Sequence, residues 1–260
     1  MSTANPKVED LFKTAAADGI ISRQTALAAI DYGAEIQAGL GIPPDEVAAT
    51  EVVLLALLVD DSGSIRFAGN SQAVRDGVNG VLQALGAAKK QNDVLVLIEL
   101  LNRGTLNPYS LLGDAKPLDD RNYNPDGSTP LFEHAVPFLA TVIAKSQEFA
   151  ANGVPCRTVS LIMTDGGDNS RRGTATEVAR ITGEMLRAEN HIIFGYGVDD
   201  GTTDFQQVFA DMGIPKQAVL ISSSDPKEIR KSFQLFSQSA VRASQNAPSF
   251  SKVAMGGFAS

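Results

Sequence analysis

Three short segments of this 260-residue chain carry oxygen-bearing side chains of the kind that hard metal ions prefer. The first segment places Asp60, Ser62 and Ser64 at alternate positions, which puts the three side chains on one side of an extended loop. The second holds Thr129 in the sequence Gly-Ser-Thr-Pro-Leu, and the third holds Asp165 before two glycines. Three hydroxyls and two carboxylates suit Mg²⁺, with Mn²⁺ or Ca²⁺ as the alternatives, if the fold brings the segments together.

The two acidic segments each follow an apolar run. Val52–Val59 is apolar at every position, which predicts a strand buried on both faces. Thr158–Thr164 is a similar run and leads into Asp165. Ligands of open α/β sheets bind at the carboxyl ends of such strands. Asp60 and Asp165 are therefore expected at the same edge of one sheet.

The rest of the chain supplies the other elements of that sheet. Further apolar runs rich in β-branched residues predict strands over Val94–Leu101, Ile192–Val198 and Ala218–Ile221. Helical spacing of apolar residues predicts helices that begin near Ser71, at Leu131, before Val178 and at Pro226, the last capped by Asp225. Strands that alternate with helices predict a mostly parallel sheet covered by helices on both faces.

Some segments depart from this alternation. Between Arg103 and Gly127 there is only a weak strand, Ser110–Leu112, which we expect to pair antiparallel at a sheet edge because no helix precedes it. Pro137 lies inside the helix that begins at Leu131 and should kink it or shorten its start.

Both ends of the chain are expected to lie outside the sheet domain. Alanine-rich stretches over Val8–Ala17 and Ser22–Leu40 predict two helices, so residues 1–48 form an N-terminal helical extension. Residues 49–243 then form the α/β domain. Residues 244–260 are small and polar and are expected to form a flexible tail.

Composition excludes several classes of function. A net charge of −8 and a pI near 4.8 leave no basic surface for phosphates, so nucleic acid is not the expected partner. Cys156 is the only cysteine, which rules out an internal disulfide. No basic-then-apolar leader and no apolar stretch of about 18 residues is found. We therefore expect a cytoplasmic protein without a membrane span.

The three segments, in this order, resemble the metal-ion-dependent adhesion site of von Willebrand factor A (VWA) domains. That motif is Asp-x-Ser-x-Ser, then a Thr, then an Asp. The five positions that match it are Asp60, Ser62, Ser64, Thr129 and Asp165. The resemblance covers about residues 50 to 240 and implies a doubly wound sheet of order 3-2-1-4-5-6. In that order the strands that end at the two aspartates are neighbours.

The resemblance also implies a function. It implies that Ser62, Ser64 and Thr129 coordinate Mg²⁺ directly, whereas Asp60 and Asp165 act largely through water. It implies a partner protein that offers Asp or Glu to the metal. The chain is similar to stand-alone bacterial intracellular VWA proteins, which implies an adaptor in a cytoplasmic complex or a stress-response system. An AAA+ ATPase, a kinase or a phosphatase would then be the partner.

Several residues have plainer interpretations. Thr129 precedes Pro130 and would be a good helix cap. By alternation, Asp61 faces away from the metal, as a solvated or loop-bonding carboxylate. Asp168 either supports the site or lies on the surface, and Cys156 is a small buried residue rather than a nucleophile.

The remaining polar residues near these loops are assigned in the same way. The two histidines, His134 and His191, are expected to be structural. Asp199-Asp200 forms a turn or a contact at the rim, and Tyr123 lies in a solvated loop or lines the mouth of the crevice.

Two other functions remain open at this stage. A metal-dependent phosphohydrolase would use Asp60 as a nucleophile, but its usual second aspartate is replaced by Ser62, and the sequence places no Lys or His near the site as a general acid. No glycine-rich P-loop occurs, so the chain supplies no ATPase of its own. A self-assembling structural protein would use the N-terminal helices to associate. The residue pattern favours binding over catalysis, so we expect no enzyme.

Overall fold

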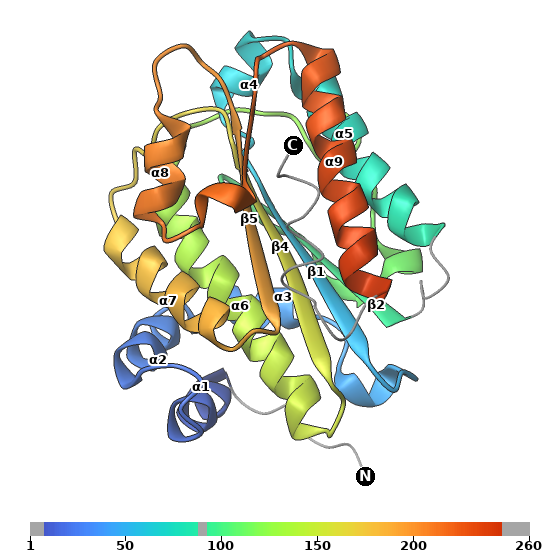
Figure 1. The fold of residues 1–260 in the computed structure, drawn as a ribbon, viewed down its shortest axis with the longest axis vertical. Helices are drawn as coiled ribbons and strands as arrows, with labels where there is room; N and C mark the ends of the chain where they lie inside the picture. The colour runs from blue at the N-terminus through green and yellow to red at the C-terminus, as the bar shows by residue number, and fades with distance from the viewer. Residues whose placement is uncertain (1–7, 88–92, 246–260) are drawn as a thin grey trace.

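The computed structural model describes residues 8–87 and 93–245, and in these residues the chain forms one six-stranded sheet (Figure 1). The strand order is β3-β2-β1-β4-β5-β6. The strands are β1 (Val52–Val59), β2 (Val94–Leu100), β3 (Gly104–Leu111), β4 (Cys156–Thr164), β5 (His191–Val198) and β6 (Val219–Ser222). Only β3 runs antiparallel to its neighbour, and it does so at the edge. The predicted doubly wound α/β fold is confirmed.

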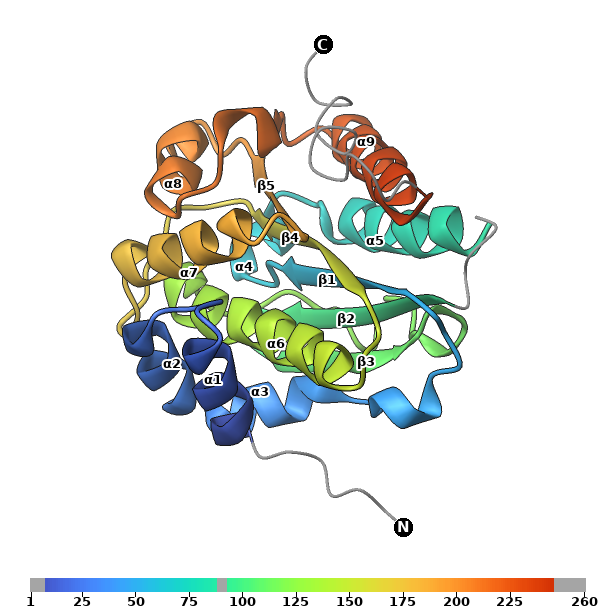
Figure 2. The same cartoon turned by 60° about the horizontal axis from the view of Figure 1, so that its bottom comes forward.

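Helices cover both faces of this sheet. Those after β1 are α4 (Gly63–Phe67), α5 (Ser71–Gly86), α6 (Leu131–Ala151), α7 (Ala175–Arg187), α8 (Phe205–Asp211) and α9 (Pro226–Gln245). The helices α5 and α9 lie together on one face, and α6 and α7 lie on the other, as Figure 2 shows. The short helix α4 lies above the carboxyl ends of the strands, at the top of Figure 1.

The register of the central strands positions the acidic loops. β1 is buried along its whole length and pairs with β4, so that Val59 lies opposite Met163. The amide of Asp60 donates to the carbonyl of Met163 at 3.1 Å. Asp60 and Asp165 consequently leave neighbouring strands at the same edge, as the apolar runs predicted.

Several elements differ from the sequence-based expectation. The edge strand β3 begins at Gly104, earlier than predicted. It contains Pro108 and pairs irregularly with β2, which an edge strand tolerates because its outer side has no partner strand in the described sheet. Helix α6 begins at Leu131 and continues through Pro137, so its start is not shortened. The short helices α4 and α8 were not expected. The predicted cap of α9 is confirmed, since Asp225 accepts from the amide of Lys227 at 2.7 Å.

The N-terminal residues form three helices rather than two. They are α1 (Val8–Ala17), α2 (Arg23–Ile30) and α3 (Gly33–Leu40). Ser22 caps α2, and the chain leaves the helical conformation at Tyr32. This break turns α3 onto α6 and β3, where Ile36 and Leu40 are fully buried.

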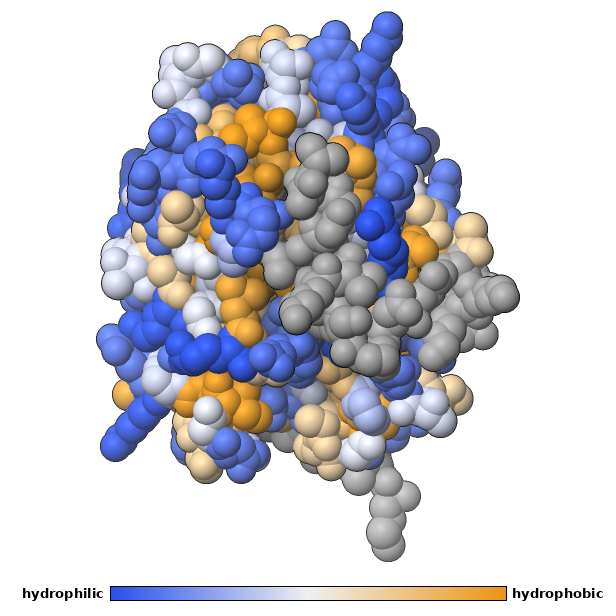
Figure 3. Space-filling view, in the orientation of Figure 1, coloured by the Kyte–Doolittle hydropathy of each residue, from blue (hydrophilic) through white to orange (hydrophobic). Residues whose placement is uncertain are grey.

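Residues 246–260, most of the predicted tail, lie outside the described residues. Within the described part of the chain, no helix combines the length and the apolar character that crossing a membrane requires. The face in Figure 3 is mostly hydrophilic, with hydrophobic residues visible between α8 and α9 and over α1.

Candidate metal centre

The first loop turns sharply at the end of β1. Asp60 is fully buried, and its Oδ1 accepts from the amide of Ser62 at 2.8 Å. Its Oδ2 accepts from the hydroxyl of Thr164 at 2.7 Å and from the amide of Asp165 at 3.3 Å. Asp60 therefore fixes the geometry of its own loop and of the loop after β4.

The two serines of this loop meet Asp165. The hydroxyls of Ser62 and Ser64 lie 2.9 Å apart, and Asp165 Oδ1 accepts from them at 3.3 and 2.7 Å. Ser62 precedes α4, yet its hydroxyl makes no capping hydrogen bond. The hydroxyl instead faces the acidic cluster, so four of the five expected residues are joined by hydrogen bonds.

Thr129 is presented by a third loop. Asn169 Oδ1 accepts from its amide at 2.9 Å, and its carbonyl accepts from the amide of Asn169 at 3.0 Å. Its hydroxyl oxygen lies 3.6 Å from the point that a Cβ on Gly166 would occupy, which places it beside the residue after Asp165. The residue is 6% exposed, and no hydrogen bond to its hydroxyl is found in the described residues. The helix-cap interpretation is wrong, because the cap position of α6 is Pro130 and the first-turn amides of Phe132 and Glu133 donate to Asp168 and Ser170 instead.

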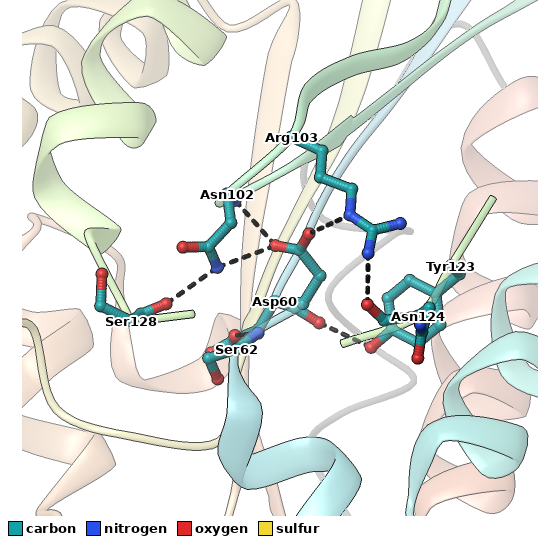
Figure 4. Close-up of polar contacts among 8 residues, drawn as sticks. Asp60, Ser62, Asn102, Arg103, Tyr123, Asn124 and Ser128 are labelled. Atoms are coloured by element: carbon teal, nitrogen blue, oxygen red, sulfur yellow. Dashed lines mark hydrogen bonds and ion pairs between the residues drawn. The ribbon is translucent and has the colours of Figure 1, made fainter. Parts of the chain in front are cut away.

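Asp61 joins the first loop to the loop that carries Thr129. Its Oδ1 accepts from the amide of Asn102 at 2.7 Å and from the side-chain amide at 3.1 Å. The same Asn102 side chain donates to the carbonyl of Ser128 at 2.9 Å (Figure 4). Arg103 lies 3.8 Å from Asp61 and donates to the carbonyl of Asn124. Of the two interpretations offered for Asp61, the loop-bonding one is confirmed.

Tyr123 holds the first loop at the end of β1. Its side chain is fully buried, and its hydroxyl donates to the carbonyl of Asp60 at 2.6 Å (Figure 4). The expectation of a solvated or crevice-lining Tyr123 is wrong, because the loop before Thr129 folds back over the end of β1. Sequence reasoning did not find Asn102, Arg103 or Asn169 at all. Their roles depend on loop-to-loop contacts that no local pattern signals.

Asp168 supports the start of α6. Its carboxylate accepts from the amide of Phe132 at 2.9 Å and from the amide of Ser170 at 3.1 Å. It therefore orders the segment that follows Thr129, and of its two interpretations the supporting role is the correct one.

The histidine of β5 and the cysteine of β4 lie away from this edge. His191 Nδ1 lies 2.7 Å from the hydroxyl of Thr158, and burial lowers the pKa of His191 to about 4. Burial raises the pKa of Cys156 to about 12. Neither side chain has the character of a catalytic group.

A cavity of about 480 Å³ opens beside the serines, between the ends of β4, β5 and β6. Asp165, Asp199 and Asp200 contribute to its lining. Asp200 also holds a turn by accepting from the amides of Thr202 and Thr203. Burial acts to raise the pKa of Asp200, but these hydrogen bonds outweigh burial and bring it to about 2.

The electrostatics of the site favour a cation. Burial, reinforced by the charge of Asp60, raises the pKa of Asp165 to about 6. Burial also raises the pKa of Asp60 itself. Two carboxylates that are both buried disfavour their charged forms, and a divalent cation between the loops would reverse that preference.

The donor set fits a hard cation of the Mg²⁺ class. In residues 8–87 and 93–245, no group of three or more His, Cys, Asp or Glu side chains is placed to hold a metal. The candidate centre combines two carboxylates with three hydroxyls, which are all oxygen donors. The hydroxyl of Thr129 makes no hydrogen bond in the described residues and is free to act as a donor to a cation, so the residues present fit the ion.

Comparisons with known proteins identify the fold. No protein-family model and no curated protein matches this sequence. Among solved structures, the open conformation of the pilus adhesin SpaC from Lactobacillus rhamnosus GG is similar, with 14% identity and a TM-score of 0.53. The match covers 75% of this chain and 30% of SpaC, so this chain spans less than a third of that protein.

Two further structures are similar to this chain. The vWF domain of the type V pili tip protein Mfa5 from Porphyromonas gingivalis has 11% identity and a TM-score of 0.51, over 77% of this chain and 98% of that domain. The manganese-loaded TRAP protein of Plasmodium vivax has 19% identity and a TM-score of 0.44, over 72% of this chain and 74% of that protein. With its strand order and its acidic strand ends, the chain has the fold of a VWA domain.

Proposed function

We propose that the three loops form a divalent-metal site through which the chain binds a partner protein. Ser62, Ser64 and Thr129 would coordinate Mg²⁺ directly, with Asp60 and Asp165 acting through water, and Mn²⁺ or Ca²⁺ are the alternative ions. A bound cation would supply an electrophilic position that an Asp or Glu of the partner fills. The observation that carries the proposal is the convergence of the Ser62–Ser64–Asp165 cluster with the Thr129 hydroxyl, which lies beside Gly166 and makes no hydrogen bond in the described residues.

The hydrogen bonds of Asp60 support binding rather than catalysis. Both of its carboxylate oxygens accept hydrogen bonds from the protein, and the residue is fully buried. These hydrogen bonds make Asp60 a residue that fixes two loops, a role that suits a binding site. The proposal is accordingly a non-enzymatic interaction module, with residues 49–243 as the VWA-like domain and residues 1–48 as a helical extension.

The biological setting proposed here follows the resemblance to stand-alone bacterial VWA proteins. The chain would act as a cytoplasmic adaptor, in a complex or a stress-response system that includes an AAA+ ATPase, a kinase or a phosphatase. Because three hydroxyls leave a bound cation largely unneutralised, a carboxylate is the partner group that this chemistry recognises.

An affinity capture from native cell extract tests the proposal. The full chain is used as bait with Mg²⁺, with EDTA, and with Thr129→Val in Mg²⁺. Because the Thr129 hydroxyl has no hydrogen-bond partner in the described residues, the valine variant removes a metal donor without breaking the loop. We expect partners that are retained only by the unaltered chain in Mg²⁺. The same partners in all three captures would contradict metal-mediated binding.

A further inference from the structure

An exposed aromatic side chain, Phe67, lies beside the candidate metal centre. Phe67 is 82% exposed, the most exposed large hydrophobic residue in the described part of the chain. The other two are Leu27 at 57% and Ile221 at 43%, on α2 and β6. Leaving a phenylalanine ring in water forgoes the favourable free energy of burying it, which is why the position of this ring is informative.

The ring of Phe67 lies against the first loop of the candidate site, which carries Ser62 and Ser64. A Cβ built on Gly63, between the two serines, would lie 3.3 Å from Phe67 Cε2 and 3.6 Å from the carbonyl oxygen of Gly127. The amide of Gly63 donates to that carbonyl at 3.1 Å. The ring therefore covers the junction between the first loop and the loop that leads to Thr129.

A charged neighbour supports the ring. The guanidinium carbon of Arg66 lies 5.1 Å from the ring centroid of Phe67, and Arg66 forms an ion pair with Asp126 at 3.4 Å. Aromatic residues and arginine are the types most enriched among the residues that dominate binding energy at protein interfaces. Here both types lie next to the position where a partner's carboxylate would bind.

The charges around the site indicate which kind of side chain lies next to the coordinating carboxylate in the partner. The cavity beside Ser64 is lined in part by Asp165, Asp199 and Asp200, and none of these forms an ion pair in the described residues. A second acidic residue of the partner would be repelled there. At Phe67 the surface offers an exposed apolar ring, and the charges beside it, Arg66 and Asp126, are paired with each other, which favours an apolar neighbour.

We propose that Phe67 anchors the interaction surface around the metal centre, and that the partner segment carries an apolar side chain next to its coordinating Asp or Glu. This inference rests on the proposed function and specifies the partner of that same site. The carboxylate of such a segment would coordinate the metal, and its neighbouring apolar side chain would cover the Phe67 ring.

A peptide selection on the immobilised full chain tests this inference. One library of short random peptides has a fixed central Glu, and a matched library has Gln at that position. Each is selected in Mg²⁺ and in EDTA on the unaltered chain, on Phe67→Ser and on Leu27→Ser, a control at a distant exposed apolar residue. Thermal unfolding verifies that the variants are folded.

We expect the unaltered chain and Leu27→Ser to enrich Glu peptides with an apolar neighbour. Phe67→Ser should lose that enrichment and bind the best peptide about tenfold more weakly. The same apolar enrichment on Phe67→Ser would overturn the role of Phe67. A selection that shows no dependence on Mg²⁺ and Glu would overturn the proposed metal-mediated function itself.

Discussion

Asp61 shows how a residue outside the metal motif controls the motif's geometry. It accepts two hydrogen bonds from Asn102, which in turn holds the carbonyl of Ser128, next to Thr129. In the proposed site the five motif residues would supply the donor atoms, while Asp61 and Asn102 join two of the loops. Both residues follow the ends of paired neighbouring strands, β1 and β2, so the pairing of these strands positions the contact.

Replacing Asp61 by alanine should therefore affect both stability and metal binding. Two donors of Asn102 lose their acceptor, which costs about 2 kcal/mol of unfolding free energy. We also expect weaker Mg²⁺ binding, because the loop of Thr129 is no longer fixed. Urea unfolding and metal titration measure the two effects. Asp120→Ala, at an exposed loop position, is the matched control. Equal metal affinity in Asp61→Ala and Asp120→Ala would contradict the positioning role.

Glu99 makes folding dependent on pH. Burial, together with the charge of Glu35, raises its pKa from 4.5 to about 8, and Tyr109 lies close enough to interact with it electrostatically. Between these pH values the unfolded chain has lost the Glu99 proton while the folded chain keeps it. The contribution of Glu99 to stability should be fully present below pH about 4.5 and should be lost as the pH rises to about 8, by a few kcal/mol at most.

Glu99→Gln isolates this contribution. The variant removes the ionisable group and keeps a side chain of the same shape, so its loss of stability between pH 4.5 and pH 8 should be smaller than that of the unaltered chain. Urea unfolding at a series of pH values, with metal excluded, provides the measurement. Identical pH profiles for the two proteins would show that Glu99 ionises freely in the folded state.

At the scale of elements, the packing of α5 on α9 depends on one glycine. A Cβ on Gly77 would lie 2.1 Å from the ring of Phe233, whereas a Cβ on Gly80, in the same helix, would meet nothing within 4 Å. Gly77→Ala should destabilise the protein by about 1 to 3 kcal/mol, because the helices must separate. Gly80→Ala should stabilise it by about 0.5 to 1 kcal/mol, since alanine favours helix. Thermal unfolding of the pair distinguishes packing from helix propensity, and equal effects would contradict the close contact.

Long elements were predictable from the sequence, and short ones were not. The continuous apolar run of β1 and the spacing of Val74, Val78 and Val81 in α5 carry enough repeats to indicate a structure. The five-residue α4 and the seven-residue α8 are too short for a helical period to emerge. The break at Tyr32 depends on the packing of α3, which the local sequence does not encode.

In the candidate site, too, some residues were predictable from the sequence and others were not. The five motif residues were predictable because their types and order resemble the VWA motif and because each lies within a few residues of a predicted strand or helix end. Asn102, Tyr123 and Asn169 reach the site from loops whose paths are set by tertiary contacts. Sequence periodicity carries no information on those paths.

At the scale of the whole molecule, the N-terminal helices share the core of the sheet domain. Phe12 and Ile36 are fully buried, and the fully buried Lys145 donates to the carbonyl of Ile42 while it pairs with Glu148 at 2.8 Å. Removing residues 1–48 would leave Lys145 without that acceptor and expose the apolar surface of α6. We expect the truncated chain to unfold at a clearly lower temperature than the full chain. Calorimetry tests this, and an unchanged transition would show that the extension folds independently.

The central claim is that three loops of one sheet edge hold a divalent cation through the residues of the motif. Calorimetric titration of Mg²⁺ and Mn²⁺ into the full chain, into Thr129→Val and into Ser128→Ala tests it most directly. The largely buried Thr129 has a hydroxyl with no hydrogen-bond partner in the described residues, and Ser128 is its exposed neighbour. We expect one site in the unaltered chain and in Ser128→Ala, and at least about tenfold weaker binding in Thr129→Val at unchanged thermal stability. Equal affinity in all three proteins, or no binding in any of them, would contradict the claim.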